Sequence, residues 1–367
     1  MRNFPANFKV GIDSRMLAHS GIGVRLYHIL NEFSKIKDKP EIYLMGNPEL
    51  IRSYPSLNSF PIVPYLANIY SIKELFGIPQ MNDFQILDIP HFNFPIRYLN
   101  RCIITIHDLT PYVMREYFPS KLKRIYLEII FRLLRFSKKV ITVSQFTSND
   151  LIKYFHFYDT SIVYNAVDTN NFYPRKLSEI QEFKYKYGLP QEYYLCVGIG
   201  KGHKNFSFLI DSFRHRYLNN EFIIPIVIAG TGGILPEELI EKIIGIEKYI
   251  ICAPKFNYNE LSLLYAGANC LIYPSLYEGF GLPLLEAQAS GCPVVSSSSS
   301  VMPEILGNSA LYFDPTNSIE LYDSILKLKS ISNDLVQKGN LNYKRYSWNK
   351  SANQILDIYS EFSEKEK

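Results

Sequence analysis

The segment PSLYEGFGLPLLEAQASGCPVV, residues 274–295, carries the pattern that decides the fold of this chain. It follows the apolar run CLIY and holds two acidic residues, Glu278 and Glu286. Gly279 and Gly281 let the backbone approach a ligand closely, and the LPLLEAQAS that follows predicts a helix whose positive N-terminus faces an anion such as a diphosphate. The two carboxylates can accept hydrogen bonds from separate hydroxyl groups of one elongated ligand. A glycine-rich strand-to-helix turn with solvated glutamates is the alternative interpretation.

Short apolar runs alternate with longer helical patterns on both sides of this segment, which is typical of parallel sheets with crossover helices. One series of runs extends from FKVGI (8–12) to TSIVY (160–164), and a second extends from YYLCVG (193–198) to ALYFD (310–314). Between them lies a polar, proline-interrupted stretch, residues 165–179, that is suited to a linker. A chain of 367 residues is long enough for two such units, so we expect two successive α/β domains.

Composition narrows the class of protein. With 47% hydrophobic and 20% charged residues the chain is globular rather than disordered, and a net charge of +4 is too small to indicate a nucleic-acid partner. The five cysteines are scattered and odd in number, which predicts neither a disulfide framework nor a zinc site and favours a reducing, cytoplasmic location. No apolar run approaches the 18 residues of a membrane-spanning helix, so any membrane contact is expected to be peripheral.

The segment KLKRIYLEIIFRLLRFSKK, residues 121–139, is the one candidate for such a contact. It carries seven basic residues and a single acid, Glu128, among aliphatic residues at helical spacing. A basic amphipathic helix can lie on an anionic membrane surface at the inner face. An ordinary crossover helix packed on the sheet is the alternative, and the two interpretations are compatible if the outer face meets lipid.

Residues 274–295 resemble the Glu-x7-Glu signature of the retaining glycosyltransferases of family 4. The likeness covers nearly the whole chain and includes a glycine-to-lysine phosphate loop, VGIGKGHKN. The matching stretches, in chain order, are residues 11–23, 103–111, 140–152, 164–174, 197–205, 260–275 and 302–315. Several independent motifs in the right order are far more specific than any one of them.

The resemblance implies a GT-B architecture, in which two Rossmann-like α/β domains with parallel sheets face a central cleft. We expect an acceptor-side domain over residues 1–170 and a nucleotide-sugar-binding domain over residues 171–345. Residues 346–367 resemble the family's final helix, which crosses back to the first domain.

The resemblance also assigns roles to residues of the second domain. Glu286 binds the nucleotide ribose, and Glu278 binds a hydroxyl of the donor sugar. Lys204 faces the diphosphate and neutralises the charge that develops on the leaving group, although a surface lysine at a helix start is the alternative. The expected backbone contacts to the donor come from Gly279, Phe280, Gly281 and Leu282.

The phosphate loop departs from the family at one position. The family often has an arginine directly after the first glycine of the loop, where this chain has Ile199. Lys201 or His203 can substitute for it, and we expect Lys201 to contact the donor.

In the first domain, His107 ends an apolar strand. A lone histidine at such a place is more often structural, but the resemblance puts it beside the donor sugar, where it assists catalysis. Gly21 and Gly23 open the first helix and are implied to form a close-approach loop at the diphosphate or the acceptor. Asp13 and Arg15 are expected to be structural.

The resemblance therefore predicts a retaining, metal-independent hexosyltransferase without a cofactor. Metal independence also follows from the lack of a D-x-D motif after a strand, with Lys204 and helix N-termini supplying the charge that a metal ion would supply. Likeness to relatives that build bacterial surface polysaccharides favours GDP-mannose as donor and a glycan or lipid-linked acceptor. A non-catalytic nucleotide-sugar-binding protein and a sugar-nucleotide epimerase of the same fold are the rival interpretations.

Overall fold

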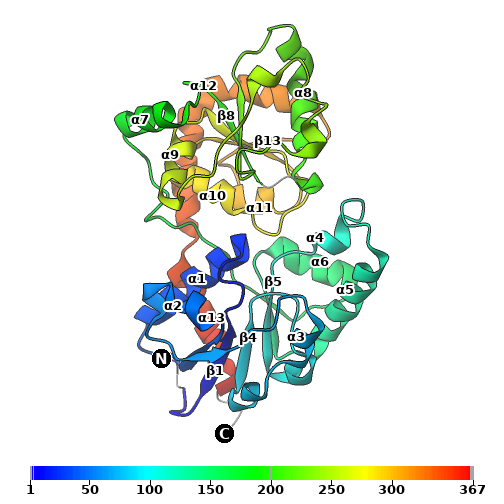
Figure 1. Cartoon of the computed structure of the whole chain (residues 1–367), viewed down its shortest axis with the longest axis vertical. Helices are drawn as coiled ribbons and strands as arrows, with labels where there is room; N and C mark the ends of the chain where they lie inside the picture. The colour runs from blue at the N-terminus through cyan, green and yellow to red at the C-terminus, as the bar shows by residue number, and fades with distance from the viewer. Residues whose placement is uncertain (1, 3, 199–200, 364–367) are drawn as a thin grey trace. The chain divides into compact units, whose positions relative to one another are not determined.

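The computed structural model describes residues 2, 4–198 and 201–363. Contacts between described residues group the chain into two compact units (Figure 1). The first unit comprises Met1–Val113, Pro119–Asn165 and Ser347–Lys367, and the second comprises Met114–Phe118 and Ala166–Tyr346. Each unit is built around its own parallel sheet, which confirms the predicted α/β class.

The sheet of the first unit has seven parallel strands in the order β3-β2-β1-β4-β5-β6-β7. The strands are β1 (Lys9–Asp13), β2 (Glu41–Gly46), β3 (Ile62–Pro64), β4 (Ile86–Ile89), β5 (Cys102–Ile106), β6 (Lys139–Thr142) and β7 (Thr160–Ile162). The sequence patterns predicted all of these strands except β3. That strand has only three residues, lies at the sheet edge and ends at a proline, which cannot donate to a ladder, so it lacks the apolar run that marks the others.

Helices cover this sheet, as Figure 1 shows. They are α1 (Ser20–Lys35), α2 (Pro48–Arg52), α3 (Ile72–Phe76), α4 (Thr110–Val113), α5 (Lys121–Leu133), α6 (Gln145–Phe155) and α13 (Trp348–Ser363). The C-terminal helix α13 packs on α1, where the Trp348 ring stacks on His28 with ring centroids 5.1 Å apart and an interplanar angle of 7°. The last helix of the chain is therefore part of the first unit.

Helix α5 begins after Ser120, whose side chain accepts a hydrogen bond from the Lys123 backbone N–H at 3.3 Å. Its inner face contributes Leu127, Ile130 and Phe131 to the hydrophobic core of the first unit. Spacing of three and four residues puts these side chains on one face of a helix, which is why the segment forms a crossover helix on the sheet.

The sheet of the second unit has six parallel strands in the order β10-β9-β8-β11-β12-β13. They are β8 (Tyr194–Val197), β9 (Ile226–Ala229), β10 (Ile250–Cys252), β11 (Cys270–Tyr273), β12 (Val294–Ser297) and β13 (Leu311–Phe313), and each lies within an apolar run that the sequence identified. In chain order, β8, β9 and β10 are added from the centre of the sheet toward one edge, and β11, β12 and β13 are added from the centre toward the other edge. This is the Rossmann order, with the reversal of direction between β8 and β11.

The helices of the second unit are α7 (Leu177–Tyr187), α8 (Phe206–Leu218), α9 (Leu261–Ala266), α10 (Leu282–Ala289), α11 (Met302–Leu306) and α12 (Ser318–Asn342). Ligands of open parallel sheets bind at the carboxyl ends of the strands near such a reversal. A ligand site is therefore expected at the loops after β8 and β11. Across the ranges that the structure describes, no helix has the length and apolarity needed to cross a membrane.

Candidate functional site

The loop after β11 turns into α10 at Gly281, which has a φ of +84° and forms the N-cap of the helix. The backbone conformation at this position therefore favours glycine, and a β-carbon would also require the Leu284 side chain, whose Cδ1 atom would lie 2.8 Å away, to move. Pro283 occupies the first turn, where its missing N–H is of no consequence. The predicted glycine-rich turn and helix are therefore present, and the start of a helix is where backbone N–H groups can bind an anion.

Lys204 and Glu278 form an ion pair at the carboxyl end of the sheet, with Lys204 Nζ 2.5 Å from Glu278 Oε1. Lys204 lies in a short 3-10 helix, η5 (Gly202–Lys204), that follows β8. Its side chain is only 16% exposed, so it is not a surface lysine. The Tyr273 hydroxyl, at the end of β11, donates to Glu278 Oε1 at 2.9 Å and accepts from Lys204 Nζ at 3.3 Å. Two of the residues predicted from sequence are thus in direct contact.

Both members of this pair are charged. Burial alone would lower the pKa of Lys204, but Glu278 and Tyr273 raise that pKa well above its usual value. Burial alone would raise the pKa of Glu278, but Lys204 holds it below its usual value. A fixed ammonium therefore lies beside the start of α10 at neutral pH.

Ser300 fixes the backbone of Glu278. Its hydroxyl accepts from the Glu278 N–H at 3.0 Å and donates to the Glu278 carbonyl at 2.8 Å. Ser300 itself has a φ of +56°, in the left-handed region. The serine-rich tract to which it belongs looks like an ordinary polar loop in the sequence, so neither Ser300 nor Tyr273 could be identified there as a neighbour of the site.

Glu286 lies in α10, and its Oε2 atom accepts a hydrogen bond from the Tyr265 hydroxyl of α9 at 2.7 Å. Burial raises the pKa of Glu286 to about 7, although Tyr265 acts in the opposite direction. The carboxyl group therefore titrates in the neutral range rather than near pH 4.5. Tyr265 is another partner that the sequence did not reveal, because it is 21 positions away and belongs to a different helix.

The other predicted donor contacts differ in their surroundings. Phe280 is buried and meets the Tyr346 ring edge-on at 5.8 Å, so only its backbone is suited to contact a ligand. Gly279 is buried and Leu282 is half-buried. Lys201 is exposed and its carbonyl accepts the N–H of Lys204, which closes the η5 turn.

Two positions of the phosphate loop, Ile199 and Gly200, lie outside the described residues. His203, the other residue considered as a substitute for the family's arginine, is buried, and its carbonyl accepts the N–H of Leu276 from the loop after β11 at 2.8 Å. This hydrogen bond ties the η5 turn to the loop that carries Glu278.

His107 follows β5 in the first unit, where its Nε2 atom donates to the Pro90 carbonyl at 2.9 Å. Burial and the nearby Arg25 lower the pKa of His107 to about 3. The imidazole is therefore neutral at physiological pH, with its proton on Nε2. It can accept a hydrogen bond through Nδ1, but it does not supply positive charge.

Gly21 and Gly23 lie in the first turn of α1, as the sequence predicted, and the structure gives them different surroundings. Gly21 is exposed, whereas Gly23 is buried. A β-carbon on Gly23 would lie 2.4 Å from the Leu17 carbonyl oxygen and 2.8 Å from that of Met16. Gly23 thus allows the helix to pack directly on the loop that follows β1.

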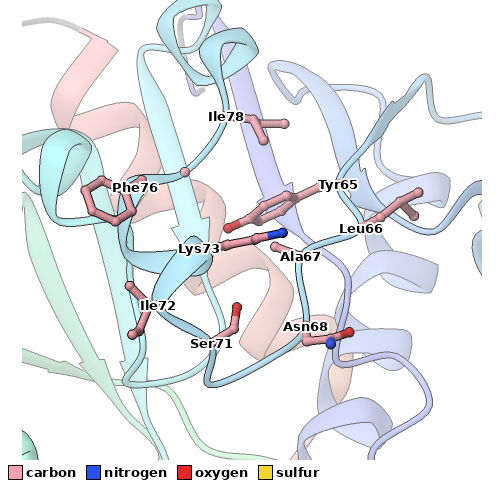
Figure 2. Close-up of a pocket in the computed structure, with 10 residues that line it drawn as sticks. Tyr65, Leu66, Ala67, Asn68, Ser71, Ile72, Lys73, Phe76 and Ile78 are labelled. Carbon is pink, nitrogen blue, oxygen red and sulfur yellow. The ribbon is translucent and has the colours of Figure 1, made fainter.

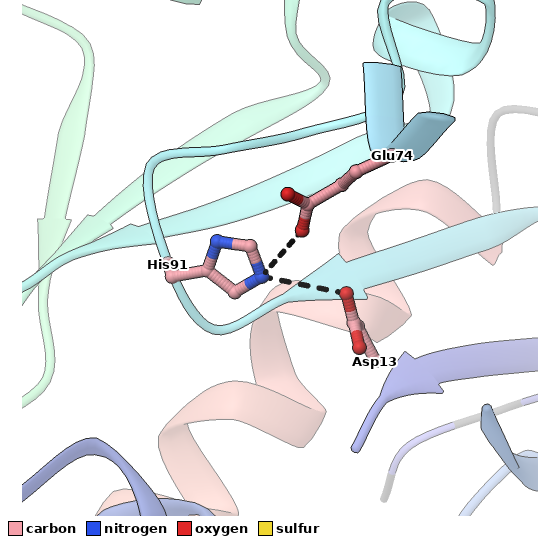
Figure 3. Close-up of side chains that lie close together, drawn as sticks. All are labelled: Asp13, Glu74 and His91. Carbon is pink, nitrogen blue, oxygen red and sulfur yellow. Dashed lines mark hydrogen bonds and ion pairs between the residues drawn. The ribbon is translucent and has the colours of Figure 1, made fainter. Parts of the chain in front are cut away.

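A buried network of charged groups surrounds Arg15 in the first unit, and Figure 3 shows three of its members, Asp13, Glu74 and His91. The Arg15 Nη2 atom lies 2.5 Å from Asp13 Oδ2 and 2.5 Å from Glu74 Oε1, and it bridges the end of β1 to α3. His91 Nε2 lies 3.4 Å from the same two oxygens. Burial alone would raise the pKa of Asp13, but His91 and Arg15 hold it well below its usual value. The expectation that Asp13 and Arg15 are structural agrees with these contacts.

Asp13, Glu74 and His91 have ligand atoms within 4.8 Å of one another, a spacing that could suit a metal ion. However, His91 Nδ1 accepts the Asn93 backbone N–H at 3.1 Å, so the proton of the neutral ring is on Nε2 and points at the carboxylates. Arg15 already supplies the positive charge that these carboxylates require. The arrangement therefore fits an ion-pair network better than a metal site.

We predict that Glu74→Gln lowers the free energy of unfolding of the first unit by about 3 kcal/mol, because it leaves a buried guanidinium with one carboxylate fewer. Urea unfolding followed by the fluorescence of Trp348 is the measurement, since this is the one tryptophan of the sequence and it lies in the first unit. Asp159→Asn is the matched control: Asp159 pairs with Lys139 but is 73% exposed, so its loss should cost less than about 1 kcal/mol. Equal losses of unfolding free energy in the two variants would contradict the assignment of Glu74 to a buried ion-pair network.

Comparisons with known proteins identify the family of each unit. The family described as Glycosyltransferase Family 4 matches residues 19–171, and the family described as Glycosyl transferases group 1 matches residues 191–330. O-antigen chain mannosyltransferase B of Escherichia coli is 29% identical over 282 residues, which cover 74% of this chain and 72% of that protein. O-antigen chain mannosyltransferase RfbU of Salmonella typhimurium is 27% identical over 262 residues, which cover 70% and 68% respectively.

Among solved structures, Anabaena Alr3699/HepE in complex with UDP and glucose has a TM-score of 0.76 at 16% identity, covering 96% of this chain and 100% of that chain. Two Rossmann-like units with these strand orders and this neighbour define a GT-B glycosyltransferase fold. The chain belongs to the glycosyltransferases, with a family 4 domain over most of its first unit and a group 1 domain within its second.

Proposed function

We propose that this glycosyltransferase transfers a hexose, with mannose favoured, from a nucleotide-diphosphate sugar to a glycan or lipid-linked acceptor in surface polysaccharide synthesis. The observation that carries the proposal is the charged Lys204–Glu278 pair beside the start of α10, with Glu286 further along the same helix. The mannosyltransferase names of the relatives support mannose as the sugar and GDP-mannose as the donor.

In this proposal the donor extends along α10. Glu286 binds the ribose hydroxyls, and the backbone of residues 279–282 together with Lys201 and Lys204 binds the diphosphate. Glu278 accepts a hydrogen bond from a sugar hydroxyl. Because Lys204 is bonded to Glu278 in the donor-free protein, the diphosphate must compete with that carboxylate for the ammonium.

The proposed reaction retains the configuration of the sugar and needs no metal ion. The bond between the sugar carbon and the phosphate oxygen breaks while the acceptor oxygen bonds to the same face of the sugar, and the acceptor proton passes to the departing phosphate oxygen. Lys204 and the α10 N-terminus stabilise the negative charge that develops on the diphosphate. His107, being neutral, contributes a hydrogen-bond acceptor for a hydroxyl group rather than positive charge.

Peripheral contact of residues 121–139 with an anionic membrane is also part of the proposal, with the enzyme at the cytoplasmic face. The outer side of α5 exposes Leu122, Ile125 and Ile129, which are 81%, 58% and 54% exposed. Basic side chains alternate with them, so this side combines apolar contact area with positive charge. The inner side of the helix packs in the core, so the crossover-helix and membrane-surface interpretations both hold in this proposal.

The direct test of the function is transfer of radiolabelled mannose from GDP-mannose to lipid-linked glycan in excess EDTA. We expect transfer to persist, and Lys204→Ala to reduce it by about 100-fold or more because the leaving group loses its cation. Lys255→Ala, an exposed lysine of the same unit, should leave the rate unchanged. Activity that requires added Mn²⁺ would contradict metal independence, and donor binding without any transfer would indicate a non-catalytic binding protein.

The raised pKa of Glu286 predicts a pH dependence of nucleotide binding. Ribose hydroxyls favour the ionised carboxylate, so below its pKa of about 7 the protein must first lose a proton and the affinity falls. Calorimetric titration with GDP should therefore show affinity that rises between roughly pH 6 and pH 8 and then levels off. Glu286→Gln is the control for the ionisation of GDP itself, and the proposal is wrong if wild type and Glu286→Gln show the same pH profile.

Charge reversal tests the membrane contact. We expect the triple change Lys121→Glu, Lys123→Glu and Arg124→Glu to abolish sedimentation with anionic phosphatidylglycerol vesicles, because each basic residue near such a surface contributes about 1 kcal/mol. The triple change Lys327→Glu, Lys329→Glu and Lys338→Glu on α12 provides a control with the same change in net charge. Equal sedimentation of the triple variant and wild type would leave α5 as a crossover helix alone.

A further inference from the structure

A second candidate ligand site lies in the first unit, outside the residues assigned to the donor. It is a hollow of about 780 Å³ beside α3, lined mainly by apolar side chains (Figure 2). Leu66, Ile72 and Phe76 line it and are 69%, 76% and 70% exposed. Large apolar side chains that cluster on the surface of a protein usually mark a binding site.

Buried contacts fix the positions of the residues that line this hollow. The Tyr65 ring at its base is buried and has the Arg15 guanidinium 3.9 Å from its centroid. Helix α3 is tied to the same arginine through Glu74, whose carboxylate also accepts the Tyr70 N–H at 2.7 Å. The helix ends at Gly77, where φ is +66° and a β-carbon would meet Met81 Sδ at 2.6 Å. The hollow is therefore largely preformed, which favours binding.

A smaller and more polar hollow of about 420 Å³ adjoins it, and the two share residues 65–68. Arg15, His19, Asn47 and Asn68 line this second hollow. Arg15 lies two residues after the end of β1, and Asn47 directly follows β2, at the edge where open parallel sheets bind their ligands. An apolar hollow thus continues into a polar one at the functional edge of the sheet.

Lys73 gives the apolar hollow a positive charge. Its side chain is exposed and points into the space next to Tyr65 (Figure 2). Within the described residues no carboxylate lies within ion-pairing distance of Lys73, and the neighbouring Glu74 is buried against Arg15. A ligand that suits this hollow therefore combines hydrocarbon with a negatively charged group.

We propose that the α3 hollow binds the hydrocarbon chain and the adjoining phosphate of a lipid-linked acceptor, while the glycan end lies in the polar hollow lined by Asn47 and Asn68. The inference rests on the proposed function, because it takes the acceptor to be carried on a lipid, and it names where in the chain that lipid is recognised. Lys73 contacts the phosphate, and Ile72 and Phe76 contact the chain.

The test is a calorimetric titration of the whole chain with decyl phosphate, kept below its micellar concentration. Inorganic phosphate, which has the same charged group but no hydrocarbon chain, is titrated for comparison. We expect decyl phosphate to bind and inorganic phosphate to bind at least tenfold more weakly. The double change Ile72→Ser and Phe76→Ser should weaken decyl phosphate at least tenfold, since each side chain loses most of its buried contact. Lys73→Gln should weaken it several-fold.

Matched controls are available in the same unit. Tyr158→Ser removes an apolar side chain that is 70% exposed, the same fraction as Phe76, and Lys37→Gln removes an exposed lysine. Neither should change the affinity for decyl phosphate. Because Ile72, Phe76 and Lys73 are exposed, their variants should remain folded, and unfolding followed by Trp348 fluorescence checks this point.

Three results would overturn the inference: equal binding of inorganic phosphate and decyl phosphate, unchanged affinity in the double variant, or equal weakening in the controls. A wild-type dimer that the double variant dissociates would also overturn it, because a second copy of the chain would then cover the hollow. Decyl phosphate is titrated without any nucleotide sugar. Failure to bind decyl phosphate would contradict the lipid site even if transfer from GDP-mannose persists. Absence of transfer with normal binding of decyl phosphate would contradict the proposed function alone.

Discussion

The contact between the Lys204 ammonium and the Glu278 carboxylate is the interaction around which the loops of the second unit are arranged. Charges removed from water are unfavourable unless they are paired and fully hydrogen-bonded. Tyr273 bonds to both members of the pair, and Ser300 holds the backbone of Glu278 from the other side. These residues come from the ends of β8, β11 and β12, which are neighbours in the sheet. The ion pair and the two Ser300 hydrogen bonds together connect the loops that follow these three strands.

This arrangement has a consequence for catalysis in the proposed reaction. A cation that is already oriented needs little reorganisation when negative charge develops on a leaving group, and such preorganised electrostatics are usually the largest contribution to catalysis. Glu278 holds Lys204 in place in this structure. In the proposed reaction the diphosphate takes over Lys204, and the carboxylate of Glu278 then binds a sugar hydroxyl.

The first unit uses a comparable device. Arg15 lies between Asp13 and Glu74 and joins the end of β1 to α3, as Lys204 joins the end of β8 to the loop after β11. In the second unit the buried cation lies at the proposed donor site. In the first it lies beneath Tyr65, where it supports the α3 hollow, and it also lines the adjoining polar hollow.

The sequence predicted the features that depend on local pattern. Apolar runs located both sheets, and the glycines before Leu282 located the start of α10. Contacts between distant residues could not be predicted. Tyr273, Tyr265 and Ser300 lie in a strand, a helix and a serine-rich tract, where their residue types give no local signal of a contact with the site. The partnership of Glu74 with Arg15 spans 59 positions and has no local signal. The neutral state of His107 likewise depends on burial and on Arg25, neither of which a strand-end motif reveals.

The central claim is that Glu278 and Glu286, similar as residue types, have different ligands along α10. Calorimetric titration of GDP into Glu278→Gln and Glu286→Gln tests it most directly. We expect Glu286→Gln to bind GDP roughly ten- to two-hundredfold more weakly, because a hydrogen bond to a charged group contributes about 1.5–3 kcal/mol. Glu278→Gln should bind GDP at least as tightly as wild type does, because its proposed partner is the sugar that GDP lacks and its carboxylate no longer competes with the diphosphate for Lys204. Loss of GDP binding in Glu278→Gln with normal binding in Glu286→Gln would contradict the account.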